Sequence, residues 1–291
     1  MNLKTTQSGF TLVEIAIVLL IVTILLGYTV ALFPRQQQLK QYRALNLEMD
    51  RVIEAIIGFA QVTGRLPCPA LATSAGLEDI DSDASDNDLG CNNYGGFVPV
   101  NTLGLEGRLN EDSLLLDPWG NPYRYYVTDI DFNGGTVSRS DFTTPGEMRA
   151  VGLVDSDADG YIDLDGRYII CDDPGTTIDS QCADADSQVF GLFQDNSGGG
   201  SPDRYGGAPF VLVSMGKNWN EADPAGDEKE NSGSTVVTGT SGTKYRLKNV
   251  AAGETTFVRR REGFADDFDD VVRWVSPGIL YSRMIQAGQL P

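Results

Sequence analysis

A short acidic stretch near the middle of the chain has the residue types and spacing to bind a divalent cation. Carboxylates recur at alternate positions from Asp155 to Asp163, and Gly160 permits the sharp bend that brings them to one side. Calcium takes six to eight oxygen ligands in a flexible shell, which this pattern can supply. The predicted ligands are Asp155, Asp157, Asp159, Tyr161 through its backbone carbonyl, and Asp163.

The pattern matches the first nine positions of an EF-hand-type loop and then departs from it. The twelfth position is Gly166 where such loops have a bidentate glutamate, so Asp165 or a distant carboxylate would have to complete the shell. A solvated acidic turn is the alternative. The second acidic stretch, residues 79–88, is less regular and lacks a central glycine. Residues 155–163 are therefore the stronger candidate for a calcium site, and residues 79–88 the weaker one.

Four cysteines offer either disulfide bonds or a metal site. Cys68, Cys91, Cys171 and Cys182 allow three pairings, and the sequence does not choose among them. Pairing nearest neighbours would join Cys68 to Cys91 and Cys171 to Cys182, each closing a polar loop. A tetrathiolate site is the alternative, but the C-x2-C spacing typical of zinc sites is absent. Disulfides would indicate an oxidising compartment such as the periplasm.

Charge and composition exclude several classes of function. The 291 residues include 22 Lys and Arg, 41 Asp and Glu and no His, for a net charge of −19. The acidity argues against nucleic-acid binding, because phosphate neutralisation needs clustered cations and the run at 259–261 leads directly into acidic residues. Without histidine the commonest general base and zinc ligand are missing.

These residues follow an apolar segment that dominates the beginning of the chain. Residues 10–33 contain one charge, that of Glu14, and as a helix they would extend about 36 Å, enough to cross a bilayer. A carboxylate inside such a segment is costly, so Glu14 needs a cationic partner. No Lys or Arg lies within the segment, whereas cleavage between Gly9 and Phe10 would create an ammonium four residues away.

The sequence Ser8-Gly9-Phe10-Thr11-Leu12-Val13-Glu14 resembles the type III signal of type IV prepilins and pseudopilins. The preceding leader is short and polar and contains Lys4, as in that family. The resemblance implies that prepilin peptidase cleaves after Gly9 and that Phe10 is then N-methylated. It also implies that Glu14 pairs with the terminal amine of a neighbouring subunit during filament assembly.

Two other interpretations of the segment are weaker. A secretory signal peptide would end in a small-x-small cleavage site, and residues 29–31 are a poor one. A plain membrane anchor leaves Glu14 and the Gly9-Phe10 junction without explanation. The cations after the segment, Arg35 to Arg43, outnumber those before it and by the positive-inside rule favour the opposite orientation. The leader and the cysteines both favour the orientation with the head in the periplasm, and we follow them over the count of cations.

The helix is expected to continue past the apolar segment. Apolar residues recur at three- and four-residue spacing from Leu39 to Ala60, which predicts an amphipathic helix that runs to about Val62 and ends before Pro67. Gly27 and Pro34 favour a kink or a melted turn in its first half.

From residue 64 the pattern changes to short β-like runs separated by Gly, Pro, Asp and Asn, which predicts a mostly antiparallel sheet. Residues 196–207 and 218–242 are expected to be loops, and residues 277–289 a closing helix. The predicted strands are 123–128, 148–154, 167–171, 189–193, 209–215, 243–247, 255–259 and 271–275.

A second motif, Asp117-Pro118-Trp119-Gly120-Asn121-Pro122-Tyr123, is similar to a segment of the major pseudopilins of type II secretion. It predicts a turn that docks an aromatic side chain before a strand begins. Those pseudopilins are usually much smaller than this chain. The large minor pseudopilin at the filament tip typically lacks the glutamate found here as Glu14.

Together these features predict an α+β, pilin-like fold in which a long N-terminal helix, membrane-spanning in its first half, packs on a mostly antiparallel β-sheet head with large loops. The expected parts are a leader (1–9), a transmembrane and assembly helix (10–33), its amphipathic continuation (34–63) and an acidic head (64–291).

The expected function is structural, as a subunit of a type IV pilus or of a type II secretion-type filament. Its partners would be prepilin peptidase, other pilin subunits and the bacterial inner membrane, with the head in the periplasm. One alternative is a low-abundance minor pilin with an adhesive or initiating role. The alternative from another class is a membrane-anchored periplasmic metal-dependent hydrolase.

Overall fold

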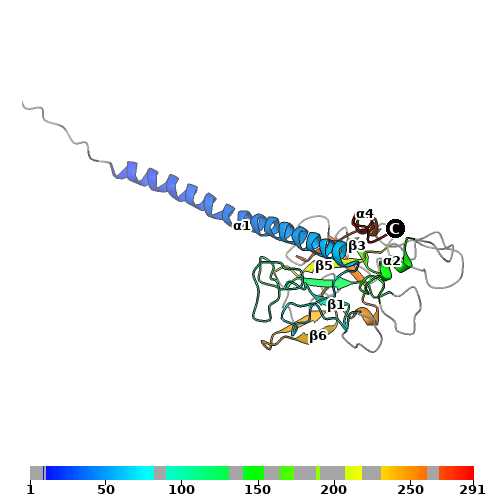
Figure 1. Ribbon diagram of the computed structural model, residues 1–291. Coiled ribbons are helices and arrows are strands. Elements are labelled where there is room, and N and C mark those ends of the chain that lie inside the picture. The colour runs from blue at the N-terminus through cyan, green and yellow to red at the C-terminus, as the bar shows by residue number, and fades with distance from the viewer. Residues whose placement is uncertain are drawn as a thin grey trace, which may run out of the picture. The chain divides into compact units, whose positions relative to one another are not determined.

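The computed structural model describes residues 9, 11–81, 90–130, 140–153, 164, 166–173, 188–190, 207–217, 231–260 and 269–291. The chain divides into two compact units, residues 1–46 and 47–291, and the boundary falls inside the first helix. The elements are α1 (Leu12–Thr63), β1 (Gly95–Phe97), β2 (Arg124–Val127), α2 (Glu147–Val151), β3 (Ile169–Asp173), β4 (Gln188–Phe190), β5 (Phe210–Ser214), β6 (Thr235–Thr238), β7 (Lys244–Leu247), the 3-10 turn η1 (Val250–Ala252), β8 (Thr256–Arg260), β9 (Val271–Trp274) and α4 (Pro277–Gln286) (Figure 1).

Helix α1 is one uninterrupted helix. It continues through Gly27 and Pro34, so the melted turn predicted there is not observed. Its last turns belong to the second unit and bury one face at three- and four-residue spacing. The residues buried on this face are Met49, Val52, Ile56, Ile57 and Ala60. The helix ends at Thr63. The next residue, Gly64, has a φ of 76° that suits a residue without a side chain, and its N–H still donates to the carbonyl of Ala60.

The described residues of the second unit form three sheets, which confirm the predicted α+β class with antiparallel pairing. The largest has the strand order β1-β2-β5-β9 and is antiparallel throughout. A second sheet, β4-β3-β8, pairs β3 with β8 in parallel and is the exception. The strands β6 and β7 form a separate antiparallel hairpin.

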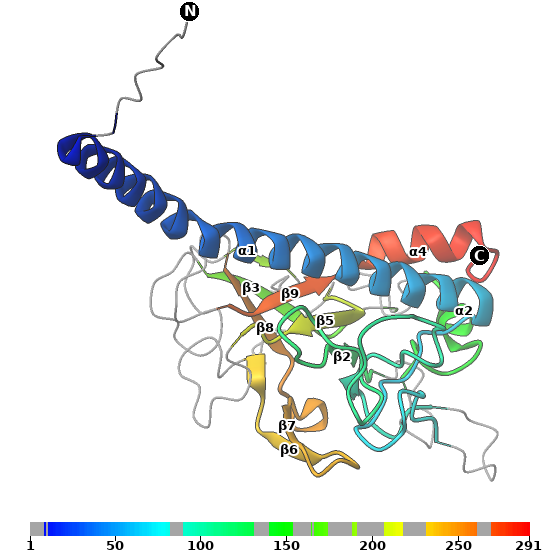
Figure 2. The same cartoon turned by 90° about the vertical axis from the view of Figure 1, so that its left-hand side faces the viewer.

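The two terminal elements of the second unit lie side by side on one face of the head (Figure 2). Gln61 on α1 donates through Nε2 to the carbonyl of Arg283 on α4 at 3.1 Å. The Arg283 guanidinium lies 3.3 Å from the Glu54 carboxylate, and an ion pair of 3.7 Å joins Asp50 to Arg273 on β9. Residues 47–63 are thus fixed by both the sheet and the last helix.

The core between the sheets is built around three aromatic rings. The ring centroid of Phe257 lies 5.1 Å from that of Tyr126 and 5.6 Å from that of Tyr168, in tilted and edge-on arrangements. All three side chains are fully buried. Edge-on aromatic contacts add to the stabilisation from the area that each ring buries, so this cluster joins β2 and β8 to Tyr168, the residue directly before β3.

Most predicted strands coincide with observed ones. The runs at 123–128, 209–215, 243–247, 255–259 and 271–275 correspond to β2, β5, β7, β8 and β9, and 167–171 and 189–193 overlap β3 and β4. The closing helix at 277–289 corresponds to α4. The predicted loop at 196–207 lies outside the described residues apart from residue 207.

The predicted strand at 148–154 is wrong, because Glu147–Val151 is the short helix α2. Met148 and Val151 are both buried, and their spacing of three residues places them on one side of a helical turn. The β-branched residues favoured a strand, but tertiary burial at helical spacing decided the local structure.

Two strands were missed. β6 lies inside the stretch 218–242 that the sequence predicts to be a loop, although its Thr235-Val236-Val237-Thr238 run is rich in β-branched residues. β1 contains two glycines, and a Cβ at Gly96 would lie 2.4 Å from the carbonyl oxygen of Ala70. Glycine here permits the close approach of two backbone segments.

The Asp117 motif forms the predicted turn. The N–H of Gly120 donates to the carbonyl of Asp117 at 3.0 Å, and Gly120 has a φ of 97°. The Asp117 carboxylate accepts from the N–H of Asn121 and, at 2.7 Å, from the Ser214 hydroxyl on β5. Tyr123 is buried where β2 begins. These bonds hold the turn on β5, and burial of the Asp117 carboxyl raises its pKa despite the donors.

Candidate functional site

Thr11 caps the beginning of α1. The N–H of Glu14 donates to Thr11 Oγ1 at 3.3 Å and to the Thr11 carbonyl at 3.1 Å. Glu14 is the third helical residue, so the two have the Thr-x-x-Glu spacing of a capping box. A carboxylate in the first turn also interacts favourably with the helix dipole. Thr11 has no role in the sequence-based predictions, although this spacing directly before an apolar run indicates a helix start.

The helix that follows Thr11 exposes apolar side chains around its whole circumference. From residue 11 to residue 26 every residue is exposed, with Leu12 at 86% and Val22 at 42% as the extremes among the large aliphatic ones. A helix that is apolar on all sides is typical of one buried in a membrane or among other helices. The exposed large aliphatic residues are Leu12, Val13, Ile15, Ile17, Val18, Leu19, Leu20, Ile21, Val22, Ile24, Leu25 and Leu26.

Glu14 is the one charged residue in this exposed surface. Its side chain is exposed, and among the described residues no cation lies within ion-pair distance of it. Gly9 is exposed as well, and Phe10 lies outside the described residues. The chain therefore has an exposed carboxylate near the capped end of an exposed apolar helix.

Within the described part of the chain, no helical stretch meets the length and apolar character of a membrane span. The side chains of residues 27–36 are not among those described.

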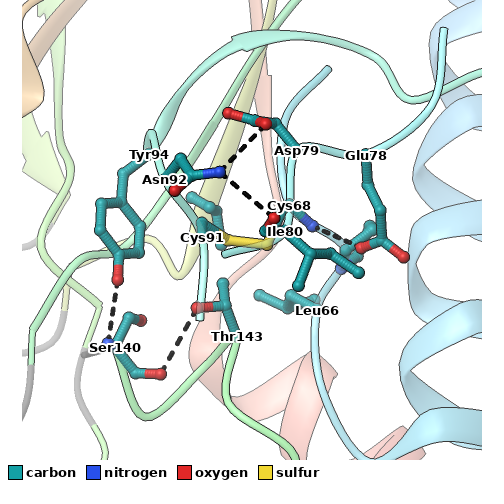
Figure 3. The surroundings of a disulfide bond; sticks show 12 residues. Leu66, Cys68, Glu78, Asp79, Ile80, Cys91, Asn92, Tyr94, Ser140 and Thr143 are labelled. Carbon is teal, nitrogen blue, oxygen red and sulfur yellow. Dashed lines mark hydrogen bonds between the residues drawn. A yellow bond between two sulfur atoms is a disulfide. The ribbon is translucent and has the colours of Figure 1, made fainter. Parts of the chain in front are cut away.

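The first two cysteines after α1 form a disulfide bond. Cys68 and Cys91 are joined with a Cα–Cα distance of 5.4 Å, which agrees with the nearest-neighbour pairing. The Cys171 side chain and Cys182 lie outside the described part of the structure. Figure 3 shows Leu66, Asp79 and Asn92 around this bond.

A buried ion pair supports the same loop. Arg65 donates through Nη1 and Nη2 to the two carboxylate oxygens of Glu78 at 2.8 and 2.9 Å, and both side chains are about 10% exposed. The Glu78 carboxylate also accepts from the N–H of Cys68 at 3.1 Å, and the Arg65 guanidinium lies 5.0 Å from the centroid of the Phe59 ring. The disulfide and this pair fix the chain where it leaves α1.

The predicted calcium ligands cannot be placed. Asp155, Asp157, Asp159, Tyr161 and Asp163 all lie outside the described residues. Of the second acidic stretch, the structure describes residues 79–81 and not 82–88.

Asp79 is held by side-chain amides. Its carboxylate oxygens accept from Asn92 Nδ2 at 3.1 Å and from Asn93 Nδ2 at 3.3 Å (Figure 3 shows Asn92). In the described ranges, no three Cys, Asp or Glu side chains come together as a possible metal-binding group.

Comparison with known proteins identifies the first part of the chain. A family model described as the prokaryotic N-terminal methylation motif matches residues 4–30. Comparison with curated proteins and with solved structures gives no match. The match covers Gly9, Phe10, Thr11 and Glu14 together with the exposed apolar turns of α1. The chain therefore carries the signature of type IV prepilins and pseudopilins.

Removal of the Cys68–Cys91 bond should cause a measurable loss of stability. The double substitution Cys68→Ala and Cys91→Ala should lower the free energy of unfolding by about 3 kcal/mol, because the cross-link no longer restricts the unfolded chain. Urea unfolding of the full chain in detergent, followed by tryptophan fluorescence, measures this.

The matched control is Cys171→Ala with Cys182→Ala, which leaves the described bond intact. In that variant, thiol labelling under denaturing conditions should find Cys68 and Cys91 unreactive. Labelling of either residue would contradict the pairing.

Proposed function

We propose that the protein is a structural subunit of a type IV pilus or of a type II secretion-type filament and that it assembles through α1. The observation that supports this most is the exposed apolar circumference of α1, which carries one carboxylate close to its capped end. Burying each large aliphatic side chain gains about 1.5–3 kcal/mol, so covering this helix gains on the order of 10 kcal/mol or more. Lipid before assembly and other helices after it would provide that cover.

The methylation motif supports a defined order of events. The subunit is inserted in the inner membrane as a single span with its head in the periplasm, and prepilin peptidase cleaves between Gly9 and Phe10. Phe10 then becomes the N-methylated first residue. Because residues 10–33 contain no cation, the new amine is the nearest group that can neutralise Glu14.

Pairing between subunits follows from the position of Glu14. Glu14 lies in the first turn of α1 and its side chain is exposed, so its carboxylate is accessible to a neighbouring chain. In an apolar filament core an unpaired charge is expensive, and a pair with good geometry offsets that cost. We infer that the Glu14 carboxylate contacts the terminal amine of an adjacent subunit and sets the stagger between them.

The central substitution is Glu14→Leu. The variant should insert in the membrane at least as well as the wild type, since it removes a charge, and should be cleaved and carry a folded head with its Cys68–Cys91 bond. It should nevertheless enter filaments at less than about a tenth of the wild-type level. The measurement is the amount of the protein in sheared filaments from cells without a wild-type copy.

Two further variants separate the charge from the helix cap. Glu14→Gln keeps the capping-box geometry and loses the charge, so it should fail as Glu14→Leu does. Thr11→Ala keeps the charge of Glu14 and loses the helix cap, so this variant should assemble to a larger extent than either Glu14 variant. If both Glu14 variants assemble at the wild-type level, the proposed pairing of the Glu14 carboxylate with the terminal amine of an adjacent subunit is wrong.

We also propose that residues 155–163 bind calcium in the head. Support comes from the sequence spacing of the carboxylates alone. A ligand that binds only the native state stabilises it by RT ln(1 + [L]/Kd), about 2.7 kcal/mol at a hundredfold excess over Kd.

Chelation should accordingly lower the melting temperature of the wild type in detergent. Asp157→Asn should melt at the lower temperature with or without calcium, whereas Asp79→Asn, in the other acidic stretch, should keep its response. A wild-type melting curve that calcium does not change would leave residues 155–163 as an ordinary acidic turn.

A further inference from the structure

Arg124 is a charged side chain in an apolar part of the head. It is the first residue of β2, and only 2% of it is exposed. The strand register places it opposite Val213 on β5, which is itself opposite Val272 on β9, so the three side chains lie on one face of the first sheet. Both valines belong to a buried apolar cluster, as does Tyr126 two residues further along β2. The guanidinium is therefore removed from water on a face whose other side chains are uncharged.

The hydrogen bonds of Arg124 are incomplete. Its Nη1 donates to the carbonyl of Ser232 at 3.5 Å, which is long for a hydrogen bond between a nitrogen and an oxygen. Among the described residues, neither the buried Nε nor Nη2 has a hydrogen-bond partner. Buried polar groups are nearly always paired with protein, water or an ion, so an unpaired one needs an explanation.

The charge of Arg124 is not balanced by an ion pair. Within the described part of the chain, no carboxylate lies within ion-pair distance of its guanidinium. Burial lowers the pKa of Arg124; Tyr126 and Asp270 oppose this change, and repulsion by Arg246 adds to it. Arginine nevertheless keeps its proton in proteins. The head therefore contains a buried positive charge, which is costly until an anion lies next to it.

The Ser232 carbonyl that accepts from Arg124 is held in place by its neighbours. The Asn231 side-chain amide donates to the carbonyl of Val258 and accepts from its N–H, both at 2.8 Å, which clamps the chain before Ser232 to β8. Gly233 follows with a φ of 77°, and a Cβ there would lie 2.4 Å from a carbonyl oxygen of β7. The Nη1 donor thus has a fixed acceptor, and the Nε–Nη2 edge of the guanidinium remains for another one.

We propose that Arg124 binds a small oxyanion of the phosphate or sulfate type, which lies against the Nε–Nη2 edge of its guanidinium. These two donors point the same way and match two oxygens of one anion, the bidentate arrangement for which arginine is suited. A water molecule would accept from Nε but would leave the charge unbalanced. Because Arg124 is buried, a carboxylate on a second protein does not reach it, and the ligand has to be small. This inference does not depend on the proposed filament role.

The test measures anion binding by the full chain in detergent, after dialysis into a chloride buffer that contains no phosphate or sulfate. Isothermal titration calorimetry with inorganic phosphate should show saturable binding with a Kd below about 1 mM, and sulfate should compete. Phosphate should also raise the urea midpoint of the wild type, because it binds the native state, whereas chloride at equal ionic strength should not.

Three substitutions separate this site from general anion effects. Arg124→Met removes the buried charge and keeps an unbranched side chain, so the variant should fold and bind phosphate at least about tenfold more weakly than the wild type. Arg124→Lys keeps the charge but lacks the planar fork, so it should weaken binding by at least about tenfold as well. The matched control is Arg149→Met, which replaces an exposed arginine on α2 and should bind phosphate as the wild type does.

The proposal is overturned if the wild type shows no saturable binding of phosphate. It is also overturned if phosphate raises the urea midpoints of the wild type and Arg124→Met equally, or if chloride has the same effect as phosphate. Arg124→Lys provides the same comparison where Arg124→Met does not fold, and wild-type affinity in Arg124→Lys would rule out the bidentate contact.

Discussion

In the first turns of α1, residues 11–26, the charge of Glu14 lies on an otherwise apolar and exposed surface, and the proposed function depends on this conflict. A helix that is apolar on every side cannot be covered by one polar-faced partner, so it needs lipid or several other helices. A carboxylate in that setting then needs a cation, and residues 10–33 supply none. In the proposed assembly each subunit contributes both the carboxylate of Glu14 and the amine that neutralises it in a neighbour. In that arrangement, neutralisation of the Glu14 charge is coupled to assembly of the subunits.

The other end of α1 is packed on the head, in contrast to the exposed first turns. Residues 47–63 bury an apolar face, pair with Arg273 and Arg283, and lead directly into the Arg65–Glu78 pair and the Cys68–Cys91 bond. A buried ion pair is expensive to break on one side, and the disulfide restricts the unfolded chain, so both features resist detachment of the helix from the head. One continuous helix thus has an exposed apolar end and an end that is part of the head's core.

The sequence predicts those features that depend on strong local periodicity or on a specific motif. The length of α1, the strands around Tyr125 and Leu212 and the closing helix follow from the spacing of apolar residues, and the methylation motif identifies the first residues. Two features that were not predicted depend on tertiary contacts. The helix at Met148 and the strand containing Gly96 are decided by burial and by close backbone approach, which no local window contains. The cap by Thr11 could have been predicted from its spacing to Glu14, whereas the parallel pairing of β3 with β8 could not, since it joins segments far apart in sequence.

The proposed pairing requires processing of the N-terminus, because without cleavage after Gly9 there is no amine at Phe10 to pair with Glu14. Intact-mass analysis of the protein extracted from membranes of peptidase-competent cells tests this directly, with cells lacking the peptidase as the control. We predict the loss of residues 1–9 and the addition of one methyl group at Phe10 in the competent cells, and the full-length chain in the control. A full-length, unmethylated chain in both would contradict the proposed role of the protein as a filament subunit.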